Sequence, residues 1–368
     1  MPGNLRDRLK RIQTLKQAQP AIEKTVASGA GAGPGIEAFI EQGWSSASPL
    51  TLKRTVKTGA IELPEKMPEA AYFVMPGVNS RTAYEDLLFF DLETTGLSTG
   101  AGTVAFLAAF GRLTKNHNAG KYSLNITQHL LLDFPGEYDF IRALLAEFTG
   151  NSVVVSYNGR NFDSPILAAR CLMNGIKPPE YCHADLLYPA RRFWKQLLPD
   201  CRQATIETCV LGIDREGDIP GAMAPEIWFA FLNNNEAEPL LGICEHNRRD
   251  IAGLASIFGL MARIAEDPLI ESKKHKFDLG VFSRHARLLF REGKYEEGRD
   301  WLNKAAELSA SESAQGLALR MLAIDSEWRQ KDKALALEFT QRALRILSPE
   351  SPLYKSFQHR EKRLQIKK

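Results

Sequence analysis

Hydrophobic and polar positions form their clearest pattern between residues 83 and 265, where apolar runs of strand length alternate with helical periodicity. Apolar and β-branched runs predict strands at Leu87–Leu92, Val104–Leu113, Tyr122–Leu132 and Val153–Val155. Apolar residues three and four positions apart predict helices at Tyr138–Phe148, from about Pro165, and at Arg191–Leu197, Thr205–Leu211, Ile227–Leu232 and Leu240–Ile264, with a short apolar piece at Ala184–Leu187. This order indicates an α/β fold with a mixed sheet. Three antiparallel strands come first, and parallel strands with helices on both faces follow, because a parallel neighbour needs a helical crossover.

The pattern is weaker before residue 83. Residues 1–35 predict a basic helix, over 4–18, followed by a flexible linker rich in Gly and Ala, and residues 36–82 form an N-terminal extension with no clear element. The composition, 44% hydrophobic and 25% charged with a net charge of +3, is that of a soluble globular protein. Five cysteines without a CxxC pair argue against a disulfide framework and predict reduced thiols in a cytoplasmic protein. No apolar run is long enough for a membrane span.

Residues 277–368 predict paired helices. Three pairs of residues correspond at an offset of 38: Gly298 and Ala336, Trp301 and Phe339, and Ala305 and Ala343. This period is close to the 34 residues of tetratricopeptide repeats, in which small residues lie where paired helices touch. We therefore expect a C-terminal helical repeat module over 277–368, suited to binding a protein partner.

Candidate chemistry begins where the apolar run before Asp91 ends. Side chains two positions apart on a strand share a face, so Asp91 and Glu93 are expected side by side at the end of a buried strand. Two buried carboxylates are costly unless a positive charge, usually a metal ion, neutralises them.

Two later motifs complete the set. Asp163 follows the fourth predicted strand, which is expected beside the first, so its turn opens close to Asp91 and Glu93. His246 and Asp250 are four residues apart and therefore share one face of the last long helix. A capping aspartate and a surface ion pair are the alternative interpretations of these two motifs.

Four carboxylates, Asp91, Glu93, Asp163 and Asp250, are the ligands that two Mg²⁺ or Mn²⁺ ions need. Such ions activate a water for attack on phosphorus and stabilise the leaving oxygen. His246 lies one turn from Asp250, and imidazole titrates near neutral pH, so His246 is the candidate general base.

The motifs "FDLETTGL", "SYNGRNFD" and "HNRRD" resemble the three exonuclease motifs of the DEDD superfamily of 3′–5′ exonucleases, which have a ribonuclease H-like fold. The segments "HADLLYPARRFWKQLLP" and "ETCVLGIDREGDIPG" are similar to those of the bacterial YprB-like group, ribonuclease H-like proteins with C-terminal tetratricopeptide repeats. The resemblance implies a ribonuclease H-like exonuclease domain over 83–265 that acts on single-stranded DNA or RNA. His246 falls at the position of the tyrosine in the YxxxD form of the third motif.

The same resemblance implies residues that hold the terminal nucleotide. Thr94, Thr95 and Gly96 match nucleotide-holding positions, and Leu97 matches an apolar wedge against the base. Asn158, five residues before Asp163, is available to contact substrate.

Three other interpretations compete with the exonuclease. The segment Gly100–Ala105 fits a dinucleotide-binding loop, but no acid occurs between Glu93 and Asp133 to hold a ribose, so no dinucleotide cofactor is expected. A catalytically silent scaffold that binds nucleic acid or protein through its repeats usually lacks one of the four acids. A structure-specific endonuclease on the same fold stays open, as does the choice between DNA and RNA.

Overall fold

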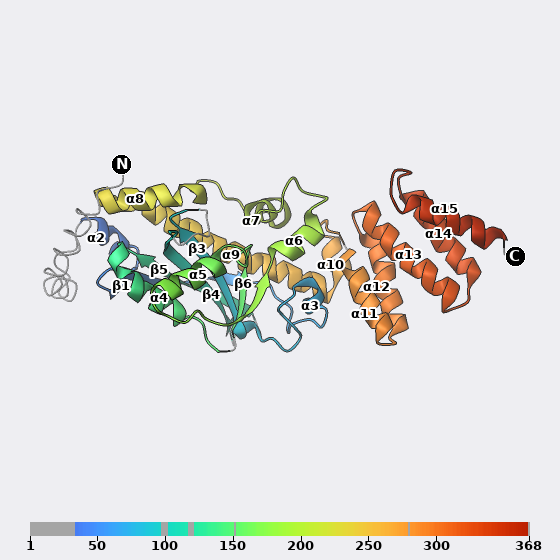
Figure 1. Cartoon of the computed structure of the whole chain (residues 1–368), viewed down its shortest axis with the longest axis horizontal. Helices are drawn as coiled ribbons and strands as arrows, with labels where there is room; N and C mark the ends of the chain where they lie inside the picture. Colours follow the sequence, from blue (N-terminus) through green and yellow to red (C-terminus); the bar gives the residue numbers. More distant parts are fainter. Residues whose placement is uncertain (1–33, 97–101, 117–120, 151, 279, 367–368) are drawn as a thin grey trace. The chain divides into compact units, whose positions relative to one another are not determined.

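The computed structural model describes residues 34–96, 102–116, 121–150, 152–278 and 280–366 and divides into two compact units (Figure 1). Unit 1 takes in the described parts of residues 1–62, 83–184 and 215–256. Unit 2 takes in 63–82, 185–214 and the described parts of 257–368. The basic helix expected over residues 4–18 lies outside the described residues.

A seven-stranded sheet forms the centre of unit 1, with the strand order β1-β2-β5-β4-β3-β6-β7 (Figure 1). Its strands are β1 (Ser45–Ser48), β2 (Thr51–Ile61), β3 (Leu87–Thr94), β4 (Ala105–Asn116), β5 (Lys121–Leu131), β6 (Val153–Ser156) and β7 (Cys182–Asp185). β3 pairs antiparallel with β4 and parallel with β6, and β4 pairs antiparallel with β5. The predicted mixed sheet is therefore confirmed.

The N-terminal extension contains two strands and two helices that the sequence pattern did not predict. β2 pairs antiparallel with β5 from Thr51 opposite Leu131 to Ile61 opposite Tyr122, and β1 pairs with β2 at the sheet edge. Most side chains of β2 after its first two residues are half-buried or exposed, and many are Lys, Arg or Thr. A strand sequence with so little apolar content lacks the alternation of apolar and polar residues that predicts a half-buried strand.

The helices expected after the first three strands are present with shifted ends. They are α4 (Glu137–Leu145), α5 (Asp163–Met173), α6 (Leu187–Trp194), α7 (Gln203–Ile206), α8 (Ala224–Asn234) and α9 (Ala237–Glu266), while α2 (Pro34–Glu41) precedes the sheet. The helix predicted at Thr205–Leu211 continues from α7 into a π-helical turn, Glu207–Leu211. In α9, residues 237–256 belong to unit 1 and the rest to unit 2.

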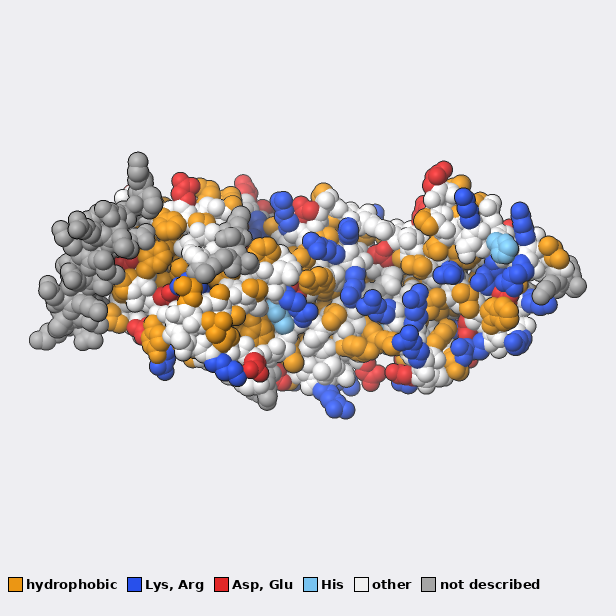
Figure 2. Space-filling view, viewed as in Figure 1, with side chains coloured by type: hydrophobic (Ala, Val, Ile, Leu, Met, Phe, Trp, Pro, Cys, Tyr) orange, Lys and Arg blue, Asp and Glu red, His pale blue; other side chains and the backbone are white. Residues whose placement is uncertain are grey.

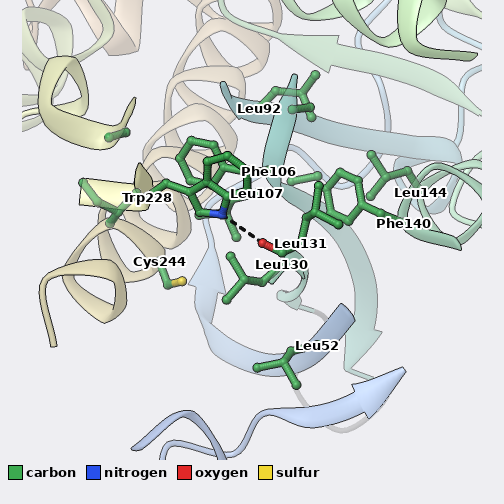
Figure 3. Packing of buried hydrophobic residues seen from close by; sticks show 14 of the residues in the cluster. Leu52, Leu92, Phe106, Leu107, Leu130, Leu131, Phe140, Leu144, Trp228 and Cys244 are labelled. Carbon is green, nitrogen blue, oxygen red and sulfur yellow. Dashed lines mark hydrogen bonds between the residues drawn. The ribbon is translucent and has the colours of Figure 1, made fainter. Parts of the chain in front are cut away.

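Aromatic and aliphatic side chains fill the core of unit 1 (Figure 3). Phe90 stacks on Phe110 with ring centroids 5.1 Å apart, and Phe148, just beyond α4, meets both rings edge-on. On α8, Trp228 stacks on Phe106, and its Nε1 donates a hydrogen bond to the carbonyl of Leu131 at 2.9 Å, drawn in Figure 3.

α9 covers the other face of β3, which carries Phe89, Asp91 and Glu93. Gly111 pairs with Phe89 across β3 and β4. A Cβ at Gly111 would lie 2.7 Å from Ile251 of α9 and 3.1 Å from Phe89. Glycine therefore allows α9 to approach the sheet closely, which brings its polar residues to the end of β3.

Unit 2 is mainly helical. Besides α6 and α7 it contains α3 (Ala71–Val74), α10 (Pro268–Ser272), α11 (Gly280–Arg291), α12 (Tyr295–Leu308), α13 (Glu312–Trp328), α14 (Lys333–Ile346) and α15 (Tyr354–Ile366). From α11 onward each helix packs against the next. The aligned Ala305, Ala336 and Ala343 are fully buried, as helix contacts require, while the repeat itself stays a prediction. Within the described part of the chain, none of the helices has the length and apolar character needed to span a membrane.

Candidate metal centre

The first two acids lie on one face of β3, as the strand alternation predicts. Asp91 pairs with Ala109 and Glu93 with Leu107 of the neighbouring strand β4. The face they share is the one covered by α9, because the side chain of Asn247 on α9 donates a hydrogen bond to Oδ2 of Asp91 at 2.8 Å.

Asp163 lies near the acids of β3 because it follows β6, the parallel neighbour of β3. It is buried and begins α5, immediately after the turn that leaves β6. A Cβ at Gly159 would lie 2.6 Å from Oδ2 of Asp163 and 2.6 Å from Oγ of Ser156, so only glycine leaves room for this carboxylate. Asp163 is the first helical residue of α5 and does not occupy the N-cap position, which is Phe162.

α9 contributes His246 and Asp250. Nε2 of His246 lies 3.2 Å from Oδ2 of Asp250 and 4.0 Å from Oε1 of Glu93. Glu245, the neighbouring residue, instead forms ion pairs with Arg248 and Arg249. The fold therefore directs His246, and not Glu245, to the acids of β3.

Two residues that the sequence analysis did not single out complete this cluster. Oδ2 of Asp218 lies 2.9 Å from Nδ1 of His246. Arg215 donates to Oδ1 of Asp250 at 2.5 Å and to Oδ2 of Asp218 at 3.2 Å. Both come from the segment before α8. It runs so close to α9 that a Cβ at Gly221 would lie 3.0 Å from Nε2 of His246.

A series of hydrogen bonds through Gln128 fixes the orientation of the Asn247 side chain, which contacts Asp91. Arg54 on β2 donates to Oε1 of Gln128 at 2.7 Å. The amide nitrogen of Gln128 donates to the carbonyl of Cys244 and to Oδ1 of Asn247, at 2.7 and 3.1 Å. Because Oδ1 of Asn247 accepts this bond, its nitrogen is the atom that faces Asp91.

Burial and repulsion act together on the β3 acids. Burial raises the pKa of Asp91 well above its usual range, and the charges of Asp163, Asp250 and Glu93 raise it further, against the hydrogen bond from Asn247. The pKa of Glu93 is also raised well above its usual range. Burial is the main cause, and neighbouring carboxylates add to it.

The charges of the cluster fit a bound cation. Five carboxylates converge here, from Asp91, Glu93, Asp163, Asp218 and Asp250, whereas Arg215 is the guanidinium that the described residues place against them. Ligand atoms of Glu93, His246 and Asp250 all lie within 4.8 Å of one another, near enough to share one metal ion. Oxygen-rich sites of this kind suit hard divalent cations.

Of the residues predicted to hold a terminal nucleotide, Thr94, Thr95 and Gly96 lie at the end of β3, and Asn158 follows β6. Thr94 Oγ1 donates to the carbonyl of Gly96 at 2.8 Å, and Thr95 Oγ1 accepts from the amide of Val104 at 3.0 Å, so both hydroxyls stabilise the local turn. Leu97 lies outside the described residues. Asn158, half-buried, has a left-handed backbone with φ of 66°, and its Oδ1 accepts a hydrogen bond from Asn161.

Two comparisons with known proteins bear on the chain that carries this acid cluster. Residues 88–262 match a sequence model described as the RNase_H superfamily. The chain is 36% identical over 181 residues to a protein of Bacillus subtilis (strain 168) described as uncharacterized protein YprB. The similarity covers 48% of this chain and 42% of the relative, so the chain spans less than half the length of that protein.

Proposed function

We propose that this protein is a metal-dependent 3′–5′ exonuclease that hydrolyses phosphodiester bonds at the ends of single-stranded nucleic acid. The observation that carries the proposal is the convergence of Asp91, Glu93, Asp163 and Asp250, with the pKa of both β3 acids raised by burial and repulsion. Burying several carboxylates together lowers the stability of the fold, and groups with strongly shifted pKa values cluster at functional sites. The RNase_H-superfamily match supports phosphodiester hydrolysis as the function of this site.

The donor set suits two divalent ions, Mg²⁺ or Mn²⁺, held by the four carboxylates. When bound, such ions supply Lewis-acid activation of a water and charge stabilisation at the leaving 3′ oxygen. The predominance of oxygen donors favours Mg²⁺ and Mn²⁺ over softer metals.

The protein's own part in the reaction is to hold and move a proton. Asp218 accepts a hydrogen bond from Nδ1 of His246, so Nε2 turns toward Glu93 and Asp250. In the proposed reaction Nε2 takes the proton of the attacking water as its oxygen bonds to phosphorus. The bond between phosphorus and the 3′ oxygen breaks, and that oxygen gains a proton from solvent.

The turn that leaves β3 is the proposed place of the terminal nucleotide. Thr94 ends β3, and Thr95 and Gly96 follow it. We propose that these three residues hold the nucleotide together with Leu97. Asn158 follows β6 and is proposed to contact the same strand.

The direct test is a gel assay with purified protein and matched single-stranded DNA and RNA 20-mers labelled at the 5′ end, in Mg²⁺ or Mn²⁺. The expected result is a ladder of products shortened stepwise from the 3′ end, absent with Asp91→Asn. The preferred oligonucleotide would identify the substrate. Failure of the wild-type protein to cleave either oligonucleotide while it binds Mn²⁺ would overturn the proposal and favour a scaffold.

A further inference from the structure

Unit 2 contains a strongly basic pair of helices. α6 and α11 pack against each other, and neither contains an Asp or Glu. Their basic residues, with Lys195 just after α6, are Arg191, Arg192, Lys195, Arg284, Arg287 and Arg291. Figure 2 shows Lys and Arg side chains gathered over the helices of unit 2. Such a surface attracts a polyanion.

A cavity of about 320 Å³ opens between these helices and the start of α13. We call it the arginine pocket. Its lining includes Arg192, Gln196, Asp278, Arg284, Ser311 and Ser313. All of them belong to unit 2.

Within the part of the chain that the structure describes, the two arginines of this pocket have no counter-ion. Among the residues that the structure describes, neither Arg192 nor Arg284 forms an ion pair or hydrogen bond. By contrast, the partly buried Arg299 and Arg360 each pair with a carboxylate. Burial lowers the pKa of Arg192, and the charge of Arg284 lowers it further. Two guanidiniums brought together without an anion carry an electrostatic cost that a bound anion would remove.

The single acid of the pocket is already engaged. Oδ1 of Asp278 accepts from the amide of Gly280 at 2.8 Å, and Oδ2 accepts from Oγ of Ser311 at 2.5 Å. Asp278 is buried and ties together the starts of α11 and α13. The pocket therefore keeps an excess of positive charge, and the starts of both helices add their positive dipole ends.

We propose that the arginine pocket binds a phosphate of a nucleic-acid backbone. The inference rests on the proposed function for its choice of polyanion. Guanidinium forks match phosphate oxygens, and the further arginines on α6 and α11 extend the positive surface beyond one phosphate. Tyr188 lies one helical turn before Arg192 and is 38% exposed, which offers a ring for base stacking beside the phosphate site.

The experiment measures binding without cleavage. The full chain is titrated in EDTA into 5′-fluorescein-labelled dT20, and fluorescence anisotropy is followed between 0.05 and 0.4 M salt. For Arg192→Gln/Arg284→Gln we expect affinity about 25-fold weaker at 0.1 M salt. The slope of log K against log salt should be shallower by about 1.4, since each lost contact to a single strand removes about 0.7. The control Arg342→Gln/Arg345→Gln, on α14, removes the same charge elsewhere in unit 2 and should change binding much less.

Parallel cleavage assays of the wild-type protein separate the two proposals. A wild-type slope in the pocket variant, with wild-type cleavage present, would overturn the pocket and leave the nuclease proposal standing. Weaker binding and a shallower slope in the pocket variant, with no cleavage by wild type, would support the pocket and overturn the nuclease. An equal loss in both double variants would overturn the pocket, because bulk charge would explain the binding. A wild-type protein that neither binds nor cleaves would overturn both.

Discussion

Asp218 and His246 are hydrogen-bonded through Oδ2 and Nδ1 at 2.9 Å, although 28 residues separate them in the chain. A carboxylate only accepts hydrogen bonds, so this contact keeps a proton on Nδ1. Nε2 is then the nitrogen that faces Asp250 and Glu93. An orienting carboxylate behind a histidine fixes both its ring and its tautomer.

The first prediction concerns this pair. His246→Ala should slow single-turnover hydrolysis by about 10²–10⁴-fold, as expected for loss of a general base. Asp218→Asn should slow it by about 10–100-fold, because the imidazole loses its fixed orientation. In the His246→Ala background, Asp218→Asn should have little further effect. Additive losses in the double variant would contradict a role of Asp218 through His246.

The second prediction concerns stability without metal. The folded-state pKa of Asp91 and Glu93 is raised, so the folded protein holds these protons more tightly than the unfolded chain. Their contribution to stability is complete below about pH 4 and is lost as pH rises through the folded-state pKa. In EDTA at pH 7.5, Asp91→Asn should therefore raise the free energy of unfolding by about 1 kcal/mol or more, since one pKa unit corresponds to about 1.4 kcal/mol.

Urea unfolding at pH 4.5 and 7.5 checks this prediction. The gain from Asp91→Asn should be larger at the higher pH, and the exposed Glu65→Gln should show no such difference. A destabilised Asp91→Asn at pH 7.5 would mean that the hydrogen bonds of Asp91 outweigh its burial cost and its repulsion from the other acids.

The third prediction concerns Arg215, whose guanidinium binds the carboxylates of Asp250 and Asp218. A cation at this position opposes a metal ion at Asp250. Arg215→Gln should therefore tighten Mn²⁺ binding by about tenfold or more, as Coulomb repulsion between charges in a partly buried site is worth several kcal/mol. Titration followed by Mn²⁺ paramagnetic resonance measures this directly. The control Arg248→Gln removes a charge from α9 that pairs with Glu245. Unchanged affinity in Arg215→Gln would argue against Asp250 as a ligand.

The fourth prediction concerns the amide of Asn247. Asn247→Ala leaves Oδ2 of Asp91 without its donor and removes one acceptor from Gln128. We expect a loss of about 1–3 kcal/mol in the free energy of unfolding and about 10–100-fold weaker Mn²⁺ binding. Asn125→Ala, which removes an exposed hydrogen bond to Thr114 on the same sheet, should change neither by as much. Wild-type Mn²⁺ affinity in Asn247→Ala would contradict a positioning role.

Several features of the site follow from local sequence rules. Strand alternation predicts that Asp91 and Glu93 share a face, and helical spacing predicts that His246 and Asp250 share another, and both are found. The close approach of Asp163 follows from the parallel pairing of β3 with β6. In each case one secondary-structure element or one pairing rule fixes the geometry.

Other features depend on contacts that no local pattern encodes. Asp218 and Arg215 lie in a segment without regular periodicity, and only the path of the chain before α8 brings them to His246. The segment "DREGDIPG" is rich in acids and glycine. That composition marks a loop but does not say which elements the loop meets. Gln128 resembles an ordinary polar position on a strand, and its role appears only when α9 lies across it.

The measurement that tests the central claim most directly compares linear and circular single strands of the same sequence, incubated with Mn²⁺ and either wild-type protein or Asp91→Asn. The account predicts that wild-type protein shortens the linear strand stepwise from its 3′ end, leaves the circle intact, and needs Asp91 for this activity. Cleavage of the circular strand, which has no end, would show that the protein is an endonuclease and would contradict the exonuclease proposal. Cleavage of the linear strand by Asp91→Asn at the wild-type rate would contradict the assignment of the acid cluster as the active site.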